Sequence, residues 1–448
     1  MEATARVPAP LTAAADDIVV RKVFRRLMWF IFILQIASFI DRINIGFAGL
    51  SMNKDLGLTT AMFGLATTVF YASYLVCEIP SNLILARYGA RMWIARIMIS
   101  WGILSAATMF AVGPWSLYGF RLLVGIAEAG FGPGILLYLT YWFPRECRAR
   151  ANALFALAIP TTICFASALS GAILELDGFL GLAGWRWLFL IEGLPAVCLG
   201  VAAYFYLPDG PATASWLAEE EKAELRARLG RDRVLEGADT ADLGVLHQLA
   251  SRNVIALSLA NFCLVTSLNA NGTWTPMIVR EFATGASYAV TGLIAAVPAL
   301  VSIPLMLLWA RSSDRRNERT WHIRLPMLMA ATGWLLVASF TTTGVRFLGL
   351  VLVSVGGFCA VTAFWTLPSS MAILSSAARP AGIALISSVG IAGAASSPFV
   401  IGMLKDLSGS FTPGLLYVVA MLVLSVIFIT IVAAHSRVPA SVEPPLRA

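Results

Sequence analysis

Long apolar runs, separated by short polar segments, dominate this chain of 448 residues. Six runs centre near residues 36, 72, 102, 129, 161 and 196, and after a polar stretch six more centre near residues 264, 298, 333, 356, 391 and 423. Each run reaches the length of about 20 residues that a helix needs to cross a bilayer. The pattern predicts an all-α membrane protein with twelve transmembrane helices in two six-helix bundles.

The polar segments divide the chain into five parts. We expect an N-terminal bundle at residues 21–207 and a C-terminal bundle at residues 252–435. A cytoplasmic linker joins them at residues 208–251, where "SWLAEEEKAELRARL" predicts a short charged helix. Residues 1–20 lack the pattern of a cleaved signal and, like residues 436–448, are predicted to be disordered cytoplasmic tails.

Composition supports a membrane protein and excludes several functions. Hydrophobic residues make up 58% of the chain and charged residues 13%. The net charge of +7 is scattered between apolar runs, which argues against a nucleic-acid-binding face. The six cysteines show neither CxxC spacing nor a histidine partner, so we expect no metal, disulfide or cofactor. No span holds a histidine or a nucleophile with a base, so we expect no enzyme.

The basic residues predict the orientation. Most of the 32 lysines and arginines fall on one side if both termini are cytoplasmic, as the positive-inside rule requires. The exceptions are five on the other side, Lys54, Arg186, Arg280, Arg346 and Lys405, and two within spans, Arg42 and Arg121. We expect a multi-pass protein of the plasma (inner) membrane, working as a monomer.

The two halves repeat one another. "FGLATTVFYASYLVCEIPSNLILARYGAR" aligns with "TGLIAAVPALVSIPLMLLWARSSDRRN", so that Gly64 matches Gly292 and Arg87 matches Arg315. Residues 151–174 likewise resemble residues 382–405. Such duplication is typical of secondary transporters, whose substrate site lies between repeats near the midplane.

Carboxylates inside spans are confined to the first half. They are Asp41, Glu78, Glu128 and Glu192. A charge in the bilayer core is costly and therefore indicates a function. Asp41 and Glu128 are the proton-coupling candidates, with helix packing by buried charge pairs as the alternative. Glu78 and Glu192, each close to a proline, are predicted to form structural or gating pairs.

The arginines inside spans are candidates for binding an anion. Arg121 lies two helical turns from Glu128 on the same face, and a guanidinium binds a carboxylate well, although Arg121 could instead reach the interface. Arg42 is predicted to add positive charge, and Asp41 to hold it by a pairing that protonation releases. Asn44 shares the helix face of Asp41 and is a further substrate-binding candidate.

Five motifs carry a family resemblance: "IDRINIGFAGLSMNKDLGL", "YLVCEIPSNLILARYGARMWIAR", "FRLLVGIAEAGFGPG", "GWRWLFLIEGLPA" and "FWTLPSS". With them the chain resembles the major facilitator superfamily and, within it, the anion:cation symporters that take up organic acids. The resemblance implies a cavity lined by the substrate-binding candidates Tyr74, Trp274, Trp365 and Ser387. It also implies gating elements at Arg87, Arg91, Asp314 and Arg315.

Three departures from the family pattern bear on specificity. Ala86 replaces an acidic residue of the first gating loop, while the second copy keeps Asp314. Ser387 and Ile391 replace two asparagines of span 11, and Asn269 replaces a tyrosine of span 7. The loss of asparagines from span 11 and the gain of one in span 7 favour a smaller dicarboxylate or an aromatic acid over a heavily hydroxylated sugar acid. Asn269 is a further substrate-binding candidate.

The sequence thus predicts proton-coupled uptake of a small organic anion, such as tartrate, a phthalate-like aromatic acid or a sugar acid, by alternating access. Its partners are then that anion, a proton and the lipid bilayer. Efflux of a drug or metabolite on the same fold is the alternative, because a fold does not fix direction or substrate.

Overall fold

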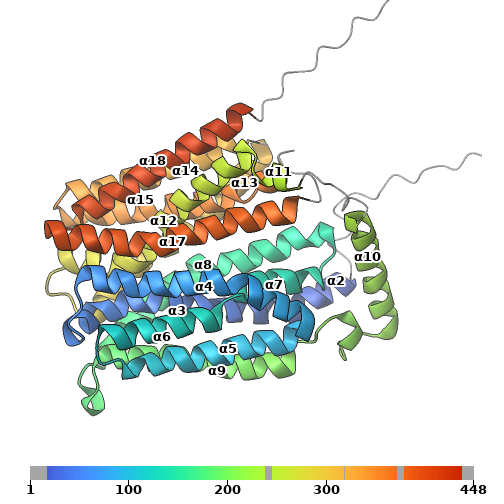
Figure 1. Ribbon diagram of the computed structural model, residues 1–448, viewed down its shortest axis with the longest axis horizontal. Helices are drawn as coiled ribbons and strands as arrows, with labels where there is room; N and C mark the ends of the chain where they lie inside the picture. The colour runs from blue at the N-terminus through green and yellow to red at the C-terminus, as the bar shows by residue number, and fades with distance from the viewer. Residues whose placement is uncertain (1–17, 238–244, 317, 371–377, 436–448) are drawn as a thin grey trace, which may run out of the picture.

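The computed structural model describes residues 18–237, 245–316, 318–370 and 378–435. They form two groups of helices that lie one above the other in Figure 1. We call residues 18–207 the N-half and residues 252–435 the C-half. The end of the molecule that carries helix α10, on the right in Figure 1, is the linker end, and the opposite end is the far end.

The N-half supplies six spans. Its helices are α2 (Ile18–Val23), α3 (Trp29–Asp55), α4 (Thr60–Tyr88), α5 (Ala90–Ala107), α6 (Pro114–Glu128), α7 (Phe131–Thr140), α8 (Arg145–Leu174) and α9 (Gly184–Tyr206). A π-helical turn, Phe24–Met28, joins α2 to α3 in one span. The fourth span is broken between α6 and α7 at Gly130, where φ is 85°, a conformation that glycine adopts without a steric penalty.

The C-half has the same plan. Its helices are α12 (Arg252–Phe282), α13 (Tyr288–Arg316), α14 (Thr320–Ser339), α15 (Thr343–Phe364), α16 (Leu367–Ser370), α17 (Arg379–Ser408) and α18 (Thr412–His435). Across the described residues, 11 helical stretches are long and apolar enough to cross a membrane. α14 packs against α15 and α18 and provides the twelfth helix. The predicted all-α fold is confirmed.

The halves meet through matching helix pairs. α4 packs on α17, α8 packs on α13, and α3 packs on α12. Glycines allow the close approach: a Cβ on Gly64 would collide with the Pro398 carbonyl oxygen, and one on Gly292 would collide with that of Ser167. Gly64 and Gly292 are the residues that the sequence repeat matches, so the duplication preserves this contact surface.

Two carboxylates link the helix pairs α4–α17 and α8–α13 at the far end through hydrogen bonds. Asp406, at the end of α17, accepts hydrogen bonds from the backbone N–H groups of Thr60 (3.0 Å) and Ala61 (2.8 Å) at the start of α4. Glu175, just after α8, accepts one from the backbone N–H of Ala289 (2.8 Å) at the start of α13. Each carboxylate therefore caps a helix of the opposite half. The far end is closed in this structure.

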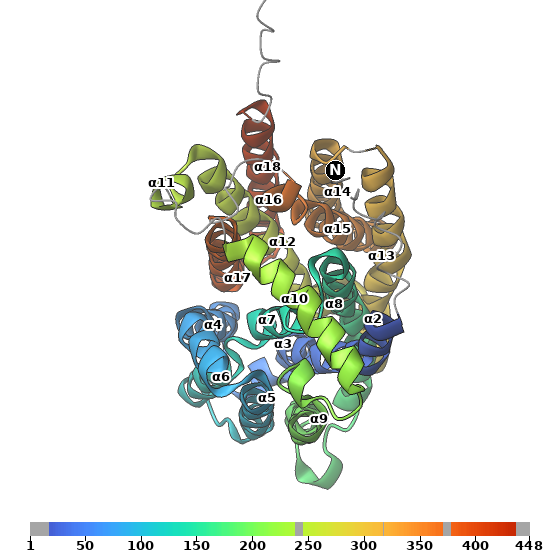
Figure 2. The same ribbon diagram turned by 90° about the vertical axis from the view of Figure 1, so that its right-hand side faces the viewer.

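The linker is attached to the N-half. It contains α10 (Glu219–Gly237) and α11 (Val245–Leu249), and Figure 2 views the molecule from this end. Lys22 Nζ lies 2.6 Å from Glu221 Oε2, and the Tyr138 hydroxyl donates to the Pro208 carbonyl at 2.8 Å. Helix α2 begins at Ile18, within the predicted tail 1–20. The rest of that tail, residues 1–17, and the predicted tail 436–448 lie outside the described residues.

Candidate functional site

Four charged side chains meet inside the N-half. Asp41 and Arg42 lie on α3, while Arg121 and Glu128 lie on α6; we call these four the charged cluster. Asp41 and Arg121 are each 2% exposed, and Glu128 is fully buried. The cluster lies near the middle of α3 and at the break between α6 and α7, away from both ends of the bundle.

Arg42 pairs with Glu128. Its Nε lies 2.7 Å from Glu128 Oε1, which also accepts a hydrogen bond from the Ser38 hydroxyl at 3.0 Å. The Arg42 guanidinium lies 4.9 Å from the centre of the Tyr74 ring, which places Tyr74 beside the cluster. The structure assigns Arg42 to Glu128 rather than to Asp41, because adjacent residues of a helix point about 100° apart.

Asp41 faces the other way, towards α5. It accepts hydrogen bonds from the indole N–H of Trp101 and, at 2.6 Å, from the Ser105 hydroxyl. Asn44 Nδ2 donates a third, at 3.2 Å, which confirms that Asn44 shares the helix face of Asp41. A buried carboxylate is thus held by neutral donors, without an ion pair to a cation among the described residues.

Arg121 is a buried cation without a carboxylate partner among the residues that the structure describes. Its guanidinium carbon lies 4.8 Å from the centre of the Phe70 ring. No carboxylate of the described residues forms an ion pair with it, and its Nε has no hydrogen-bond acceptor. A buried unpaired charge is costly. An anion supplied from outside the chain would compensate it.

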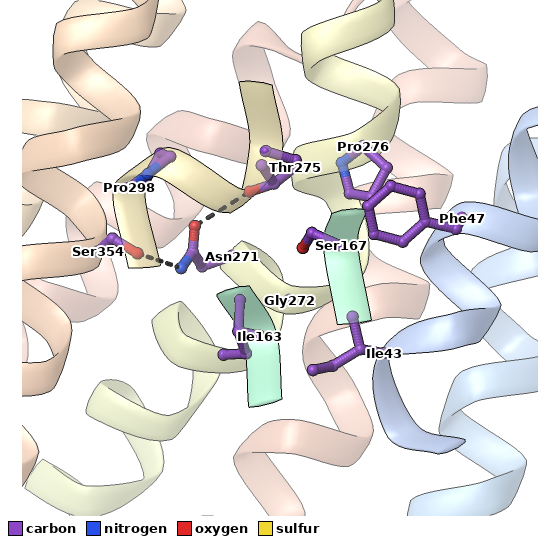
Figure 3. Close-up of a pocket in the computed structure, with 11 residues that line it drawn as sticks. Ile43, Phe47, Ile163, Ser167, Asn271, Gly272, Thr275, Pro276, Pro298 and Ser354 are labelled. Carbon is purple, nitrogen blue, oxygen red and sulfur yellow. Dashed lines mark hydrogen bonds between the residues drawn. The ribbon is translucent and has the colours of Figure 1, made fainter. Parts of the chain in front are cut away.

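A small pocket lies between the halves. Figure 3 shows it lined by Ile43 and Phe47 of α3, Ser167 of α8 and the C-half residues Asn271, Thr275 and Ser354. Asn271 Nδ2 donates to the Ser354 hydroxyl at 3.2 Å, and the Thr275 hydroxyl donates to Asn271 Oδ1 at 3.0 Å. The C-half therefore offers amide and hydroxyl groups, and the N-half contributes mainly apolar surface to this pocket.

The predicted substrate-binding residues of the C-half occupy different surroundings. Asn269 Oδ1 accepts from the hydroxyls of Thr273 and Ser397 at 3.4 Å, and its side chain interacts with Tyr71 of the N-half. Trp274 is fully buried between Phe63 and Phe411, so it packs the closed far end.

The other two lie nearer the linker end. Trp365 caps the end of α15 and is 37% exposed. Ser387 lies partly exposed on α17, four residues before Ile391, which packs against Phe70 and Tyr74. Among the residues predicted for the C-half, Asn269 thus contacts Tyr71 of the N-half, whose neighbours include Arg42 and Arg121.

The predicted gating residues all lie at the linker end. Asp314 pairs with Arg319 of its own half, at 2.6 Å. Arg91 donates its backbone N–H to Asp209 of the linker at 2.9 Å and its side chain to the Tyr204 carbonyl. Arg87 lies against Tyr88, and Arg315 is exposed. Their role in gating stays a prediction.

Sequence reasoning missed the neutral partners of the cluster. Ser38, Trp101 and Ser105 hold the carboxylates, and Tyr71 bridges to Asn269. One signal was present: Trp101 and Ser105 are four residues apart, so they share a helix face. Asn271 and Thr275 repeat that spacing in the pocket. In the part of the chain that the structure describes, no three His, Cys, Asp or Glu side chains are grouped to hold a metal.

Comparisons with known proteins place the chain among transporters. The model of the Major Facilitator Superfamily matches residues 31–378. A protein of Agrobacterium vitis with the name "Putative tartrate transporter" is 44% identical over 95% of this chain and 93% of its own. A "Quinolone resistance transporter" of Acinetobacter baumannii is 35% identical over 93% and 95%.

Solved structures show the same fold. A bacterial homologue of the human lysosomal transporter Spinster, in an inward-facing and unoccupied conformation, superposes with a TM-score of 0.72. Its sequence is 18% identical, and the match covers 94% of this chain and 97% of that chain.

Proposed function

The chain belongs to the major facilitator superfamily, and we propose that it imports a small organic anion together with a proton across the plasma (inner) membrane, by alternating access. The observation that carries the proposal is Arg121, a buried guanidinium without a carboxylate partner among the described residues. A substrate carboxylate would provide that partner through paired, charge-assisted hydrogen bonds.

The arrangement of Arg42 suggests how a proton and an anion would be coupled. With Glu128 ionised, Arg42 is engaged in the ion pair at 2.7 Å. A proton on Glu128 would remove that negative charge and free the guanidinium, so that Arg42 and Arg121 could both attract the anion. By linkage, a bound anion must favour proton uptake to the same degree.

Asp41 is the second proton-coupling residue in this proposal. It lies on the same helix as Arg42 and close enough to Glu128 and Arg121 to feel their charges. A proton on Asp41 would reduce the negative potential around the anion site. Asn271, Thr275 and Ser354, the neutral polar groups that line the small pocket, would then contact the rest of the substrate.

The closed far end suggests the state that the structure represents. If the linker and both termini are cytoplasmic, as the basic residues predict, the far end faces outside. Closure there by Asp406 and Glu175 would leave the site to open towards the cytoplasm. The relative of Agrobacterium vitis suggests tartrate as a substrate, and aromatic and sugar acids remain within the proposal.

Uptake into proteoliposomes tests the proposal. The panel contains tartrate, a sugar acid, phthalate and a hydroxylated aromatic acid, each with and without an imposed inward proton gradient. We expect one class to accumulate only with the gradient, and Arg121→Ala to abolish its binding. Lys54→Ala is the matched control, because it removes an exposed cation at the end of α3. Unchanged affinity in Arg121→Ala would refute the anion site.

Efflux is the second candidate, since one relative is named a quinolone resistance transporter. The same vesicles distinguish it. An exporter would expel a preloaded aromatic compound against its gradient, and none of the anions would accumulate when the proton gradient points inward.

A further inference from the structure

A third carboxylate lies buried next to Asp41, on α9. Glu192 is 4% exposed, and its Oε1 accepts a hydrogen bond from the Ser170 hydroxyl of α8 at 2.7 Å. Its Oε2 has no donor, and no lysine, arginine or histidine of the described residues pairs with it. A charge so placed would be compensated by neither water nor a cation, so the neutral acid is the less costly form.

Asn44, the neighbour of Glu192, also has a buried oxygen without a hydrogen-bond donor. Asn44 lies within hydrogen-bonding reach of Glu192. Asn44 Nδ2 donates to Asp41 Oδ1 at 3.2 Å, whereas Asn44 Oδ1 is buried without a donor. Two acceptor oxygens, Glu192 Oε2 and Asn44 Oδ1, are thus each without a donor in one small region. A single proton on Glu192 would satisfy both.

We propose that Glu192 stays neutral during transport and acts as a positioning residue for Asp41. As a carboxylic acid it donates its O–H to Asn44 Oδ1, which fixes the amide with Nδ2 directed at the Asp41 carboxylate. The proposal rests on the coupling role of Asp41 given above. It assigns Glu192 to setting how tightly Asp41 holds a proton, without itself carrying one across.

The groups around Asp41 and Glu192 explain why the orientation of the Asn44 amide is important. Asp41 also receives hydrogen bonds from Trp101 and Ser105 of α5, and the charges nearest to it are those of Glu128 and Arg121 on α6. Ser170 of α8 completes the set around Glu192. If the amide reversed, its oxygen would face the carboxylate and a donor would be lost. Asp41 would then hold a proton more tightly, because its ionised form is less stabilised.

Two substitutions of Glu192 separate positioning from proton transport. In Glu192→Gln the amide N–H can still donate to Asn44 at every pH, so we expect gradient-driven uptake with the pH profile of the wild type. In Glu192→Met the donor is gone, so we expect the midpoint of that profile to move upward by about one pH unit, as the loss of one hydrogen bond predicts.

Asn44→Leu is the matched variant on the other side of the contact. It removes the same donor to Asp41, so it should shift the profile in the same direction, and the double variant with Glu192→Met should show no larger shift. Substrate exchange without a gradient reports whether each variant is folded. If Glu192→Met fails to fold, Asn44→Leu and Glu192→Gln still test whether Glu192 positions Asn44.

Infrared difference spectra provide a readout that is independent of transport. At neutral pH the spectrum of the wild type minus that of Glu192→Gln should contain the carbonyl band of a neutral buried carboxylic acid, because the other buried carboxyl groups are present in both proteins. Absence of that band from the difference, or a carboxylate band in its place, would overturn the proposal. A Glu192→Gln variant that loses gradient-driven uptake but keeps exchange would also overturn it, because Glu192 would then have to ionise. If the wild type itself shows no proton-driven uptake, the failure lies in the proposed function, and the positioning role falls with it.

Discussion

The two halves of this molecule share a helical plan but differ in what they bury. The N-half buries the ionisable side chains Asp41, Glu78, Arg121, Glu128 and Glu192. Among the described residues of the C-half, the buried polar side chains are hydroxyls and amides, with His322 near the linker end. At the surface where the halves meet, by contrast, the same features recur: paired glycines and a carboxylate that caps a helix of the other half.

This contrast indicates that the contact surface between the halves and the buried interior have different functions. The closing surface has to be complementary from both sides, so the duplicated glycines and caps were kept. The interior needs charge in one place only, because each buried charge carries a cost and a second cluster would add nothing to the one anion site that we propose. We therefore expect substitutions of the charged cluster to affect coupling, those of the C-half pocket to affect affinity, and those of the caps to affect the balance of conformations.

The largest effects should come from Asp41 and Glu128, the two proton-coupling candidates of the N-half. Asp41→Asn and Glu128→Gln should each lower gradient-driven accumulation by more than about tenfold while leaving substrate exchange, because a neutral side chain cannot take up and release a proton. Glu281→Gln is the matched control in the C-half. Glu281 is partly exposed and paired with Lys405 at 2.8 Å, and such surface pairs contribute little. Accumulation by both N-half variants at the wild-type level would remove the functional difference between the halves.

A large effect is also expected where the halves are alike. Gly64→Val and Gly292→Val should both prevent closure of the far end, since each added side chain would meet backbone of the opposite half. Transport should fall by about tenfold, and the distance between spin labels placed across the far end should increase. Gly119→Val on α6 is the control, because a Cβ there meets nothing within 4 Å. Different outcomes for Gly64 and Gly292 would show that the closing surface is not symmetric in function.

The sequence predicted the symmetric parts of the molecule better than the site. Hydropathy was sufficient for the spans, and the sequence repeat matches Gly64 with Gly292, the two glycines at which the structure brings the halves into close contact. Adjacency showed that Asp41 and Arg42 diverge, but it could not supply Glu128 as the partner of Arg42. That pairing joins α3 to α6 across 86 positions of the chain, and it depends on how the helices are rotated. The neutral donors Trp101 and Ser105 were missed for the same reason: their spacing of four residues places them on one face of α5, but it does not show that this face is turned towards Asp41.

The neutral pocket of the C-half should give smaller effects of a different kind. Asn271→Ala removes the hydrogen bonds to Ser354 and Thr275 and one group that faces the pocket. We expect the substrate affinity to fall about fivefold, as for the loss of one neutral hydrogen bond. The pH profile of uptake should not move, because no ionisable group is touched. A shift of that profile would mean that the C-half takes part in coupling.

The smallest effects should come from the two caps, where the halves are most alike. Glu175→Gln and Asp406→Asn retain the shape of the side chain but remove the negative charge from the start of a helix, so each should shift the equilibrium towards the open far end by a few-fold. Spin labels across the far end measure the shift. The double variant should combine both effects, since the caps lie on separate helix pairs.

Acidification should also shift the conformational equilibrium towards the open far end. The hydrogen bond from the Ala289 N–H, together with those from Ser287 and Tyr288, holds the pKa of Glu175 below its usual value of 4.5. A lowered pKa in the closed form means that the cap stabilises closure fully above about pH 4.5 and loses its effect as the pH falls through the lower value. Closure should therefore be independent of pH near neutrality and weaken only under acid conditions, and less so in Glu175→Gln. A far end that opens between pH 6 and pH 8 would exclude this carboxylate as the cause and direct attention to a different group.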